Sequence, residues 1–194
     1  MMQYQNFVHA SKDHQLVVMN ELFEPCQGLI RLTVDDDGFM PRARELDNYK
    51  EFIELVRSTL IQVCLEVEME ASSSSSSTGN RRKLLEDVVN AHPRLGETKK
   101  QLSTHSMLEQ KNLQSSQDSP EIQKKLLELN HEYEKVYPGL RFVVFVNGRT
   151  RLEIIRIMES RITSGNDWFK EVRTAMQELC NIAQDRYRKN SSRL

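Results

Sequence analysis

A histidine followed by a proline is the first feature of this chain that could do chemistry. Residues 91–96 read Ala-His-Pro-Arg-Leu-Gly and follow an apolar helical pattern. Because proline lacks an N–H and disfavours helical angles at the preceding residue, the helix must end at His92. We expect the imidazole at a helix C-terminus beside a tight turn, where the helix dipole favours its protonated form. Such a histidine is a candidate general acid or base, although a lone histidine at a helix end is more often structural.

Three polar side chains follow at helical spacing. Ser106, Glu109 and Gln110 stand at i, i+3 and i+4, so a helix there would place all three on one face. That face could hydrogen-bond a polar substrate, or it could be ordinary solvent-facing polarity. The spacing alone is compatible with both.

Arg186 continues the stripe of apolar residues on the last predicted helix. An arginine on a core-facing stripe must be paired or must meet an anionic ligand, although a snorkelling arginine at the end of a bundle has the same periodicity. Arg94 and Arg149 lie in predicted turns and are weaker candidates than Arg186 for binding an anionic ligand. The stripe that leads to Arg186 has spacings of four and three, at Trp168, Val172, Ala175, Leu179 and Ile182.

Helices must position these residues, because helical periodicity dominates the chain. Thr150 and Glu153 form a capping box that opens one helix, and Asn166 and Asp167 cap the last. We predict an all-α, single-domain helical bundle over residues 1–194, without repeats. Beside the helix that would carry Ser106 and Glu109, helices are expected at about residues 16–23, 49–64, 83–91, 120–136, 150–162 and from 168 onward.

Two stretches depart from this periodicity. Residues 142–146 are strand-like in composition but have no partner strand, so we expect a buried extended segment or the start of an apolar helix. Residues 70–82 contain a run of six serines, from Ser72 to Ser77. Such a run cannot bury apolar surface, so we expect a flexible insertion there.

The composition argues against several classes of binding partner. The 194 residues carry a formal net charge of −1, which argues against a nucleic-acid or membrane-surface partner. The three cysteines, Cys26, Cys64 and Cys180, are far apart and form neither a disulfide framework nor a metal-ligand spacing. We therefore predict no metal site.

Four separated blocks, in order along the chain, carry a family resemblance. They lie at residues 92–96, 106–110, 137–149 and 179–186. Together they resemble the 2-oxo-4-hydroxy-4-carboxy-5-ureidoimidazoline (OHCU) decarboxylases, in a fungal-like form, over most of residues 15–190. These are the last enzymes of the route from urate to S-allantoin.

The resemblance implies a cofactor-free decarboxylase in urate catabolism. It implies that His92 and Glu109 are the catalytic residues, with His92 as general acid or base, and it leaves the division of roles between the two open. The carbon that bears the substrate's carboxylate neighbours a C=N bond, so the substrate supplies its own electron sink. The implied substrate-binding residues are Pro93, Ser106, Gln110, Phe142, Val144, Val146, Asn147 and Arg186.

The last three residues suggest a location. Ser192-Arg193-Leu194 is a close variant of the Ser-Lys-Leu peroxisomal address. We expect the peroxisomal import receptor as a partner, with a cytoplasmic location as the alternative. The family resemblance is also compatible with a homodimer.

Two other functions stay open. A catalytically inactive helical interaction module would keep the bundle, and Arg186 would then pair internally. A related lyase could act on another small anionic heterocycle, because a fold does not determine its substrate.

Overall fold

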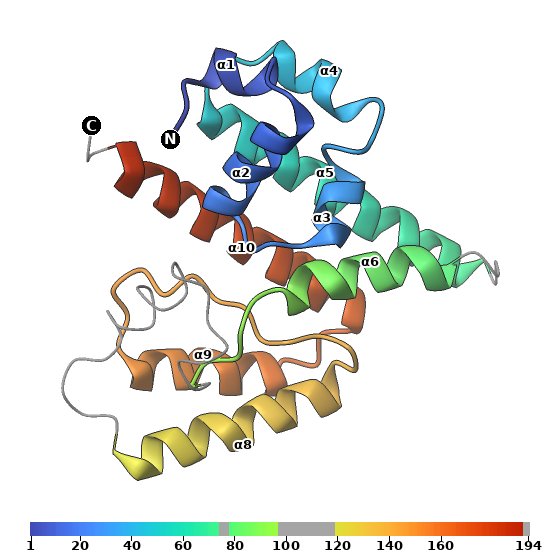
Figure 1. Cartoon of the computed structure of the whole chain (residues 1–194). Helices are drawn as coiled ribbons and strands as arrows, with labels where there is room; N and C mark the ends of the chain where they lie inside the picture. The colour runs from blue at the N-terminus through green and yellow to red at the C-terminus, as the bar shows by residue number, and fades with distance from the viewer. Residues whose placement is uncertain (74–77, 97–118, 192–194) are drawn as a thin grey trace.

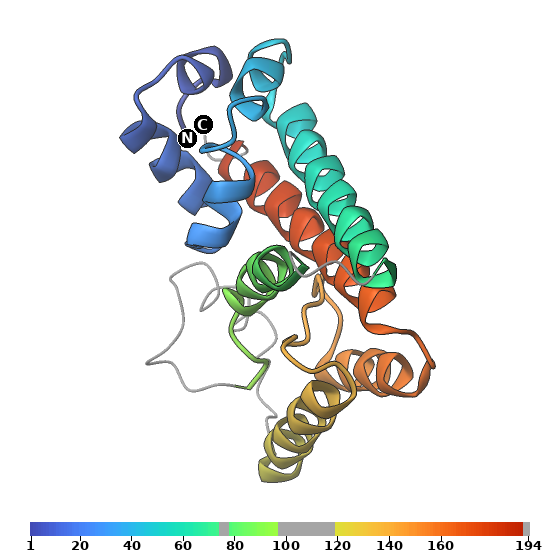
Figure 2. The ribbon, with the colours of Figure 1, turned by 90° about the vertical axis from the view of Figure 1, so that its right-hand side faces the viewer.

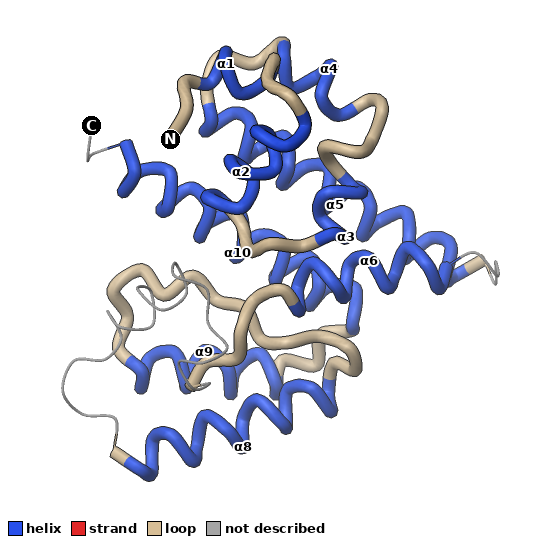
Figure 3. The backbone as a smooth tube through the Cα atoms, in the orientation of Figure 1, coloured by secondary structure: helices blue, strands red, loops and turns tan. Residues whose placement is uncertain are grey.

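A computed structural model describes residues 1–73, 78–96 and 119–191 (Figure 1). None of these residues lies in a strand (Figure 3), so the predicted all-α class is confirmed. No helix in the described ranges is both long and apolar enough to span a bilayer. The helices are α1 (Tyr4–Val8), α2 (Lys12–Leu22), α3 (Gln27–Leu32), α4 (Phe39–Arg44), α5 (Tyr49–Ser72), α6 (Thr78–Asn90), α8 (Pro120–Val136), α9 (Arg151–Thr163) and α10 (Trp168–Ser191).

The two longest helices, α5 and α10, run antiparallel along one another (Figures 1 and 2). Helices α1 and α4 lie beside the beginning of α5, while α2 packs against α10 and α3 against α6 (Figure 1). Helix α6 packs against α3, α5 and α10, while α8 and α9 pair with each other below α10 in the view of Figure 1. A single cluster of buried apolar side chains joins these helices.

Several helices begin where local side-chain chemistry predicts. The capping box of α9 is present: Thr150 Oγ1 accepts from the Glu153 N–H, and the Glu153 carboxylate accepts from the Thr150 N–H. Asp167 accepts from the Lys170 N–H at 2.7 Å and so caps α10. These bonds satisfy N–H groups that have no partner within their helix.

Helices extend into the serine-rich stretch. Helix α5 continues to Ser72 and α6 begins at Thr78, so residues 70–72 and 78–82 are helical, and the centre of the predicted insertion, residues 74–77, lies outside the described residues. The guanidinium of Arg81, in the first turns of α6, bridges to Glu66 and Glu70 of α5. This pairing links the end of α5 to the beginning of α6.

The chain from Tyr137 to Thr150, which joins α8 to α9, is neither helix nor strand. Within it, Phe142, Val143 and Val144 are buried. Of the two alternatives for residues 142–146, the buried non-helical segment is therefore confirmed. We call residues 142–147 the linker segment.

Candidate active site

His92 lies just beyond the end of α6, as the proline predicts. Its side chain is buried, with 8% of the residue exposed. Its N–H donates to the Val89 carbonyl at 3.2 Å, and its own carbonyl accepts from Arg141 Nη1 at 3.3 Å. Arg141 Nη1 also donates to the Asn90 carbonyl at 2.8 Å. Arg141 therefore ties the turn that carries His92 to the start of the linker segment.

The imidazole of His92 is held in its neutral form. Burial is the main cause that lowers its pKa, from 6.5 to about 4, and the charge of Arg186 lowers it further. The charge of Glu24 and the Val88 carbonyl act in the opposite direction but are outweighed. The helix end favours the protonated form, but burial outweighs this effect and leaves the imidazole neutral.

One ring nitrogen of His92 lacks a hydrogen bond of good geometry. His92 Nδ1 is buried and has no partner of good hydrogen-bond geometry among the described residues. Because a buried polar atom without a partner is costly, it marks a place where a ligand or water would be stabilised.

Arg186 forms a buried ion pair. Its Nη2 lies 2.7 Å from Glu24 Oε1, and the two side chains are 3% and 4% exposed. Glu24 follows the end of α2 and comes from the other end of the chain. Arg186, at the end of the α10 stripe, is thus paired. The charges of Arg186 and Glu24 both affect the pKa of His92.

Glu24 is not among the site residues predicted from the sequence. The signal that could have found it is an acidic residue directly after the apolar Leu22-Phe23 and before Pro25, where a solvent-facing position is not expected. A carboxylate at such a place needs a cationic partner.

A pocket of about 380 Å³ lies between the linker segment and the end of α10. This volume suits a small heterocyclic ligand. On α10, Ile182, Asp185 and Lys189 line the pocket, and Arg186 belongs to the same face of the helix. The pocket is lined by Val144, Phe145, Val146, Asn147, Gly148, Ile182, Asp185 and Lys189.

The linker segment ends in a turn at the pocket. Asn147 has a φ of 46° and Gly148 a φ of 73°, and the Arg149 N–H donates to the Val146 carbonyl at 2.9 Å. A positive φ is uncommon outside glycine, although asparagine tolerates it better than most residues. The turn puts Val146, Asn147 and Gly148 in the pocket wall.

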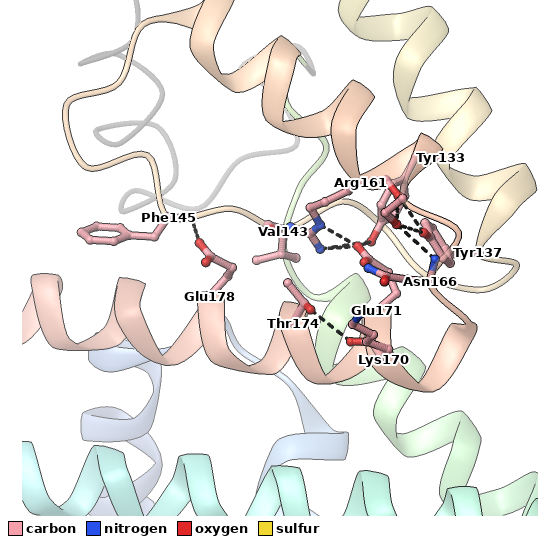
Figure 4. A network of polar contacts seen from close by, with 11 residues as sticks. Tyr133, Tyr137, Val143, Phe145, Arg161, Asn166, Lys170, Glu171, Thr174 and Glu178 are labelled. Carbon is pink, nitrogen blue, oxygen red and sulfur yellow. Dashed lines mark hydrogen bonds and ion pairs between the residues drawn. The ribbon is translucent and has the colours of Figure 1, made fainter.

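Side chains hold alternate backbone groups of the linker segment (Figure 4). Arg161 Nη1 donates to the Val143 carbonyl at 2.7 Å, and the Phe145 N–H donates to Glu178 Oε2 at 2.6 Å. Val144 lies between the two bonded residues and lines the pocket. Its backbone N–H and C=O make no hydrogen bond to another described residue.

A buried polar network fixes Arg161 (Figure 4). Glu171 has no exposed surface, and its Oε1 accepts from Arg161 Nε and from the Tyr133 hydroxyl, each at 2.6 Å. Burial raises the pKa of Tyr133, so the hydroxyl stays protonated and donates. The Arg161 guanidinium also lies 4.6 Å from the centroid of the Phe142 ring.

The structure brings some of the predicted site residues together and leaves others apart. His92 and Arg186 are neighbours, and Val144, Val146 and Asn147 share the pocket wall. Phe142 instead packs inward, against Arg161 and Tyr133. Pro93 is half-buried in the turn beside His92.

The remaining predicted residues either lie outside the described ranges or bond to other parts of the protein. Ser106, Glu109 and Gln110 lie outside the described residues, as does the tripeptide 192–194. Arg94 pairs with Glu134 at 2.5 Å, and Arg149 donates to the Phe145 carbonyl at 2.6 Å. Within the described ranges, no group of three or more histidine, cysteine or acidic side chains could hold a metal ion.

The chain matches the model of a known protein family. No curated protein matches the chain in sequence. The family model for OHCU decarboxylase matches residues 9–188, which is nearly the whole chain.

Proposed function

The chain belongs to the OHCU decarboxylase family, and we propose that it converts 2-oxo-4-hydroxy-4-carboxy-5-ureidoimidazoline to S-allantoin without a cofactor. Family membership implies a decarboxylase role in urate breakdown. The observation that carries the proposed reaction is a neutral, buried histidine beside the Glu24–Arg186 pair.

The chemistry needs little from the protein except position and proton transfer. The bond to the carboxylate breaks, carbon dioxide leaves, and the electron pair forms a double bond to the neighbouring imine carbon while the imine nitrogen gains a proton. The carbon that lost the carboxylate now carries an enol hydroxyl. When this hydroxyl gives up its proton, it becomes a carbonyl, and the former imine carbon gains a proton. Protonation on one face of the carbon sets the configuration.

We assign the proton transfer at the substrate's hydroxyl to His92. A neutral imidazole has one nitrogen that accepts and one that donates, so it can take up and return a proton. Burial of the ring also keeps bulk water away from the intermediate. In this proposal Glu109 completes the catalytic pair.

Arg186 provides positive charge, and Glu24 holds its guanidinium in place. The ion pair is nearly inaccessible to water, so its electrostatic effect on a bound anion is screened little. The backbone groups of Val144 would hydrogen-bond the ring, and Ser106 and Gln110 would add neutral hydrogen bonds. These contacts orient the substrate for loss of carbon dioxide.

The test follows the circular dichroism of substrate generated in place from urate by urate oxidase and hydroxyisourate hydrolase. We expect the protein, without added metal or cofactor, to accelerate the appearance of dextrorotatory S-allantoin. His92→Asn and Glu109→Gln should abolish this acceleration, while His131→Asn, at an exposed histidine on α8, should retain it. A wild-type trace that matches the spontaneous racemic decay, with the protein folded, would refute the proposal.

A helical interaction module without catalysis is the second candidate. The internal pairing of Arg186 with Glu24 is what that alternative predicts as well. The same assay separates the two, because an inactive module leaves the spontaneous decay unchanged.

Peroxisomal import remains a prediction from Ser192-Arg193-Leu194. A fluorescent protein fused to the N-terminus should enter peroxisomes, and removal of these three residues should leave it in the cytoplasm. A cytoplasmic signal for both fusions would contradict the predicted import.

A further inference from the structure

The linker segment depends on side chains for its position. It belongs to no helix or sheet, so no regular ladder of backbone hydrogen bonds holds it. Two of the hydrogen bonds at its centre come from side chains of helices, Arg161 on α9 and Glu178 on α10 (Figure 4). They reach the Val143 carbonyl and the Phe145 N–H, on either side of Val144.

Arg161 is a rigid anchor. Its pairing with the fully buried Glu171 and its contact with the Phe142 ring leave the guanidinium little freedom. Glu178 links the segment to the pocket, because it lies one helical turn before Ile182, a residue of the pocket wall. Helix α10 therefore both holds the segment and forms the opposite side of the pocket.

We propose that Glu178 and Arg161 are positioning residues that hold Val143 and Phe145 so that the backbone N–H and C=O of Val144 are presented to the pocket. These two groups form a donor–acceptor pair that complements a ring with adjacent N–H and C=O groups, as in a cyclic ureide. The identity of this ligand rests on the proposed function.

Glu178 is the residue to change, because loss of Arg161 would leave the buried carboxylate of Glu171 without its cation and would unfold the protein in part. Glu178→Ala removes the acceptor for the Phe145 N–H. Glu178→Gln keeps an acceptor oxygen at the same place. Gln177→Ala, at the exposed neighbouring position on α10, is the matched control.

Two readouts are needed. The first is the dissociation constant for S-allantoin, used as a cyclic ureide probe and measured by calorimetry. The second is the pair of constants kcat and KM for decarboxylation. A ring contact made equally in the ground state and the transition state changes KM and leaves kcat unchanged. A smaller folded fraction instead lowers apparent kcat and leaves KM unchanged.

We expect Glu178→Ala to raise both the allantoin dissociation constant and KM about 10-fold, the size of a lost charge-assisted hydrogen bond. Glu178→Gln should stay within about threefold of wild type, and Gln177→Ala should match wild type. Unchanged binding and KM in Glu178→Ala would overturn the positioning role while leaving the proposed function intact.

The binding readout separates this inference from the proposed function. A wild-type protein that binds allantoin without turnover refutes the decarboxylase, and the binding ratio of the two Glu178 variants still decides the positioning role. A wild-type protein that does not bind allantoin overturns the inference.

Discussion

The buried neutral His92 should make the stability of the folded protein depend on pH. In the unfolded chain the imidazole binds a proton with a pKa of 6.5, whereas in the folded protein its pKa is about 4. Between these values the unfolded state binds more protons, so the free energy of unfolding falls as pH falls. From about pH 7 to about pH 5 the expected loss from His92 alone is roughly 2 kcal/mol.

The assay is urea denaturation at a series of pH values for wild type and for His92→Gln. Other groups titrate in both proteins, so the difference between their unfolding free energies isolates His92. That difference should change by roughly 2 kcal/mol in the direction that favours wild type as pH rises. A difference that does not vary with pH, or that varies with the opposite sign, would refute the argument that burial outweighs Glu24 and the helix dipole.

Three further predictions concern stability and are measured by urea unfolding. Glu24→Ala should lower the unfolding free energy by about 3–5 kcal/mol, because it leaves Arg186 charged and buried without this partner; a loss below about 1 kcal/mol would contradict the observed burial of the pair. Gly139→Ala should cost about 1–2 kcal/mol, because φ is +86° there and the new Cβ would lie 2.7 Å from Glu86 Oε1; an unchanged midpoint would show that the turn relaxes. Thr150→Ala should cost about 1 kcal/mol through loss of the α9 capping box, and Thr150→Ser, which keeps the hydroxyl, should restore most of it.

The turn at His92 shows how much a local sequence pattern can predict. The proline after His92 sets the end of α6, because its ring disfavours helical angles at the preceding residue and its missing N–H removes a hydrogen bond within the helix. The helix over Pro120–Val136 and the capping box at Thr150 were likewise predictable, since periodicity and caps involve neighbours within a few positions. The all-α class follows from the same local signals.

The electrostatic state of the site depended on contacts that no local pattern contains. Glu24 meets Arg186 from 162 positions away in the chain. The pKa of His92 then follows from how deeply these helices bury it, which outweighs the effect of its helix end. Desolvation is a property of the packed assembly rather than of a motif.

In the linker segment, too, some features were predictable from local sequence and others depended on the fold. Its composition predicted a buried stretch, and Val144, Val146 and Asn147 were predicted as binding residues. Which backbone groups are held was decided by Arg161 and Glu178, on two other helices. The sequence by itself determined the longer helices and the residue types of the site, whereas the short helices α1, α3 and α4 were not predicted from it. The tertiary structure decided charge pairing, protonation and backbone hydrogen bonding, because these depend on distances between residues far apart in the chain.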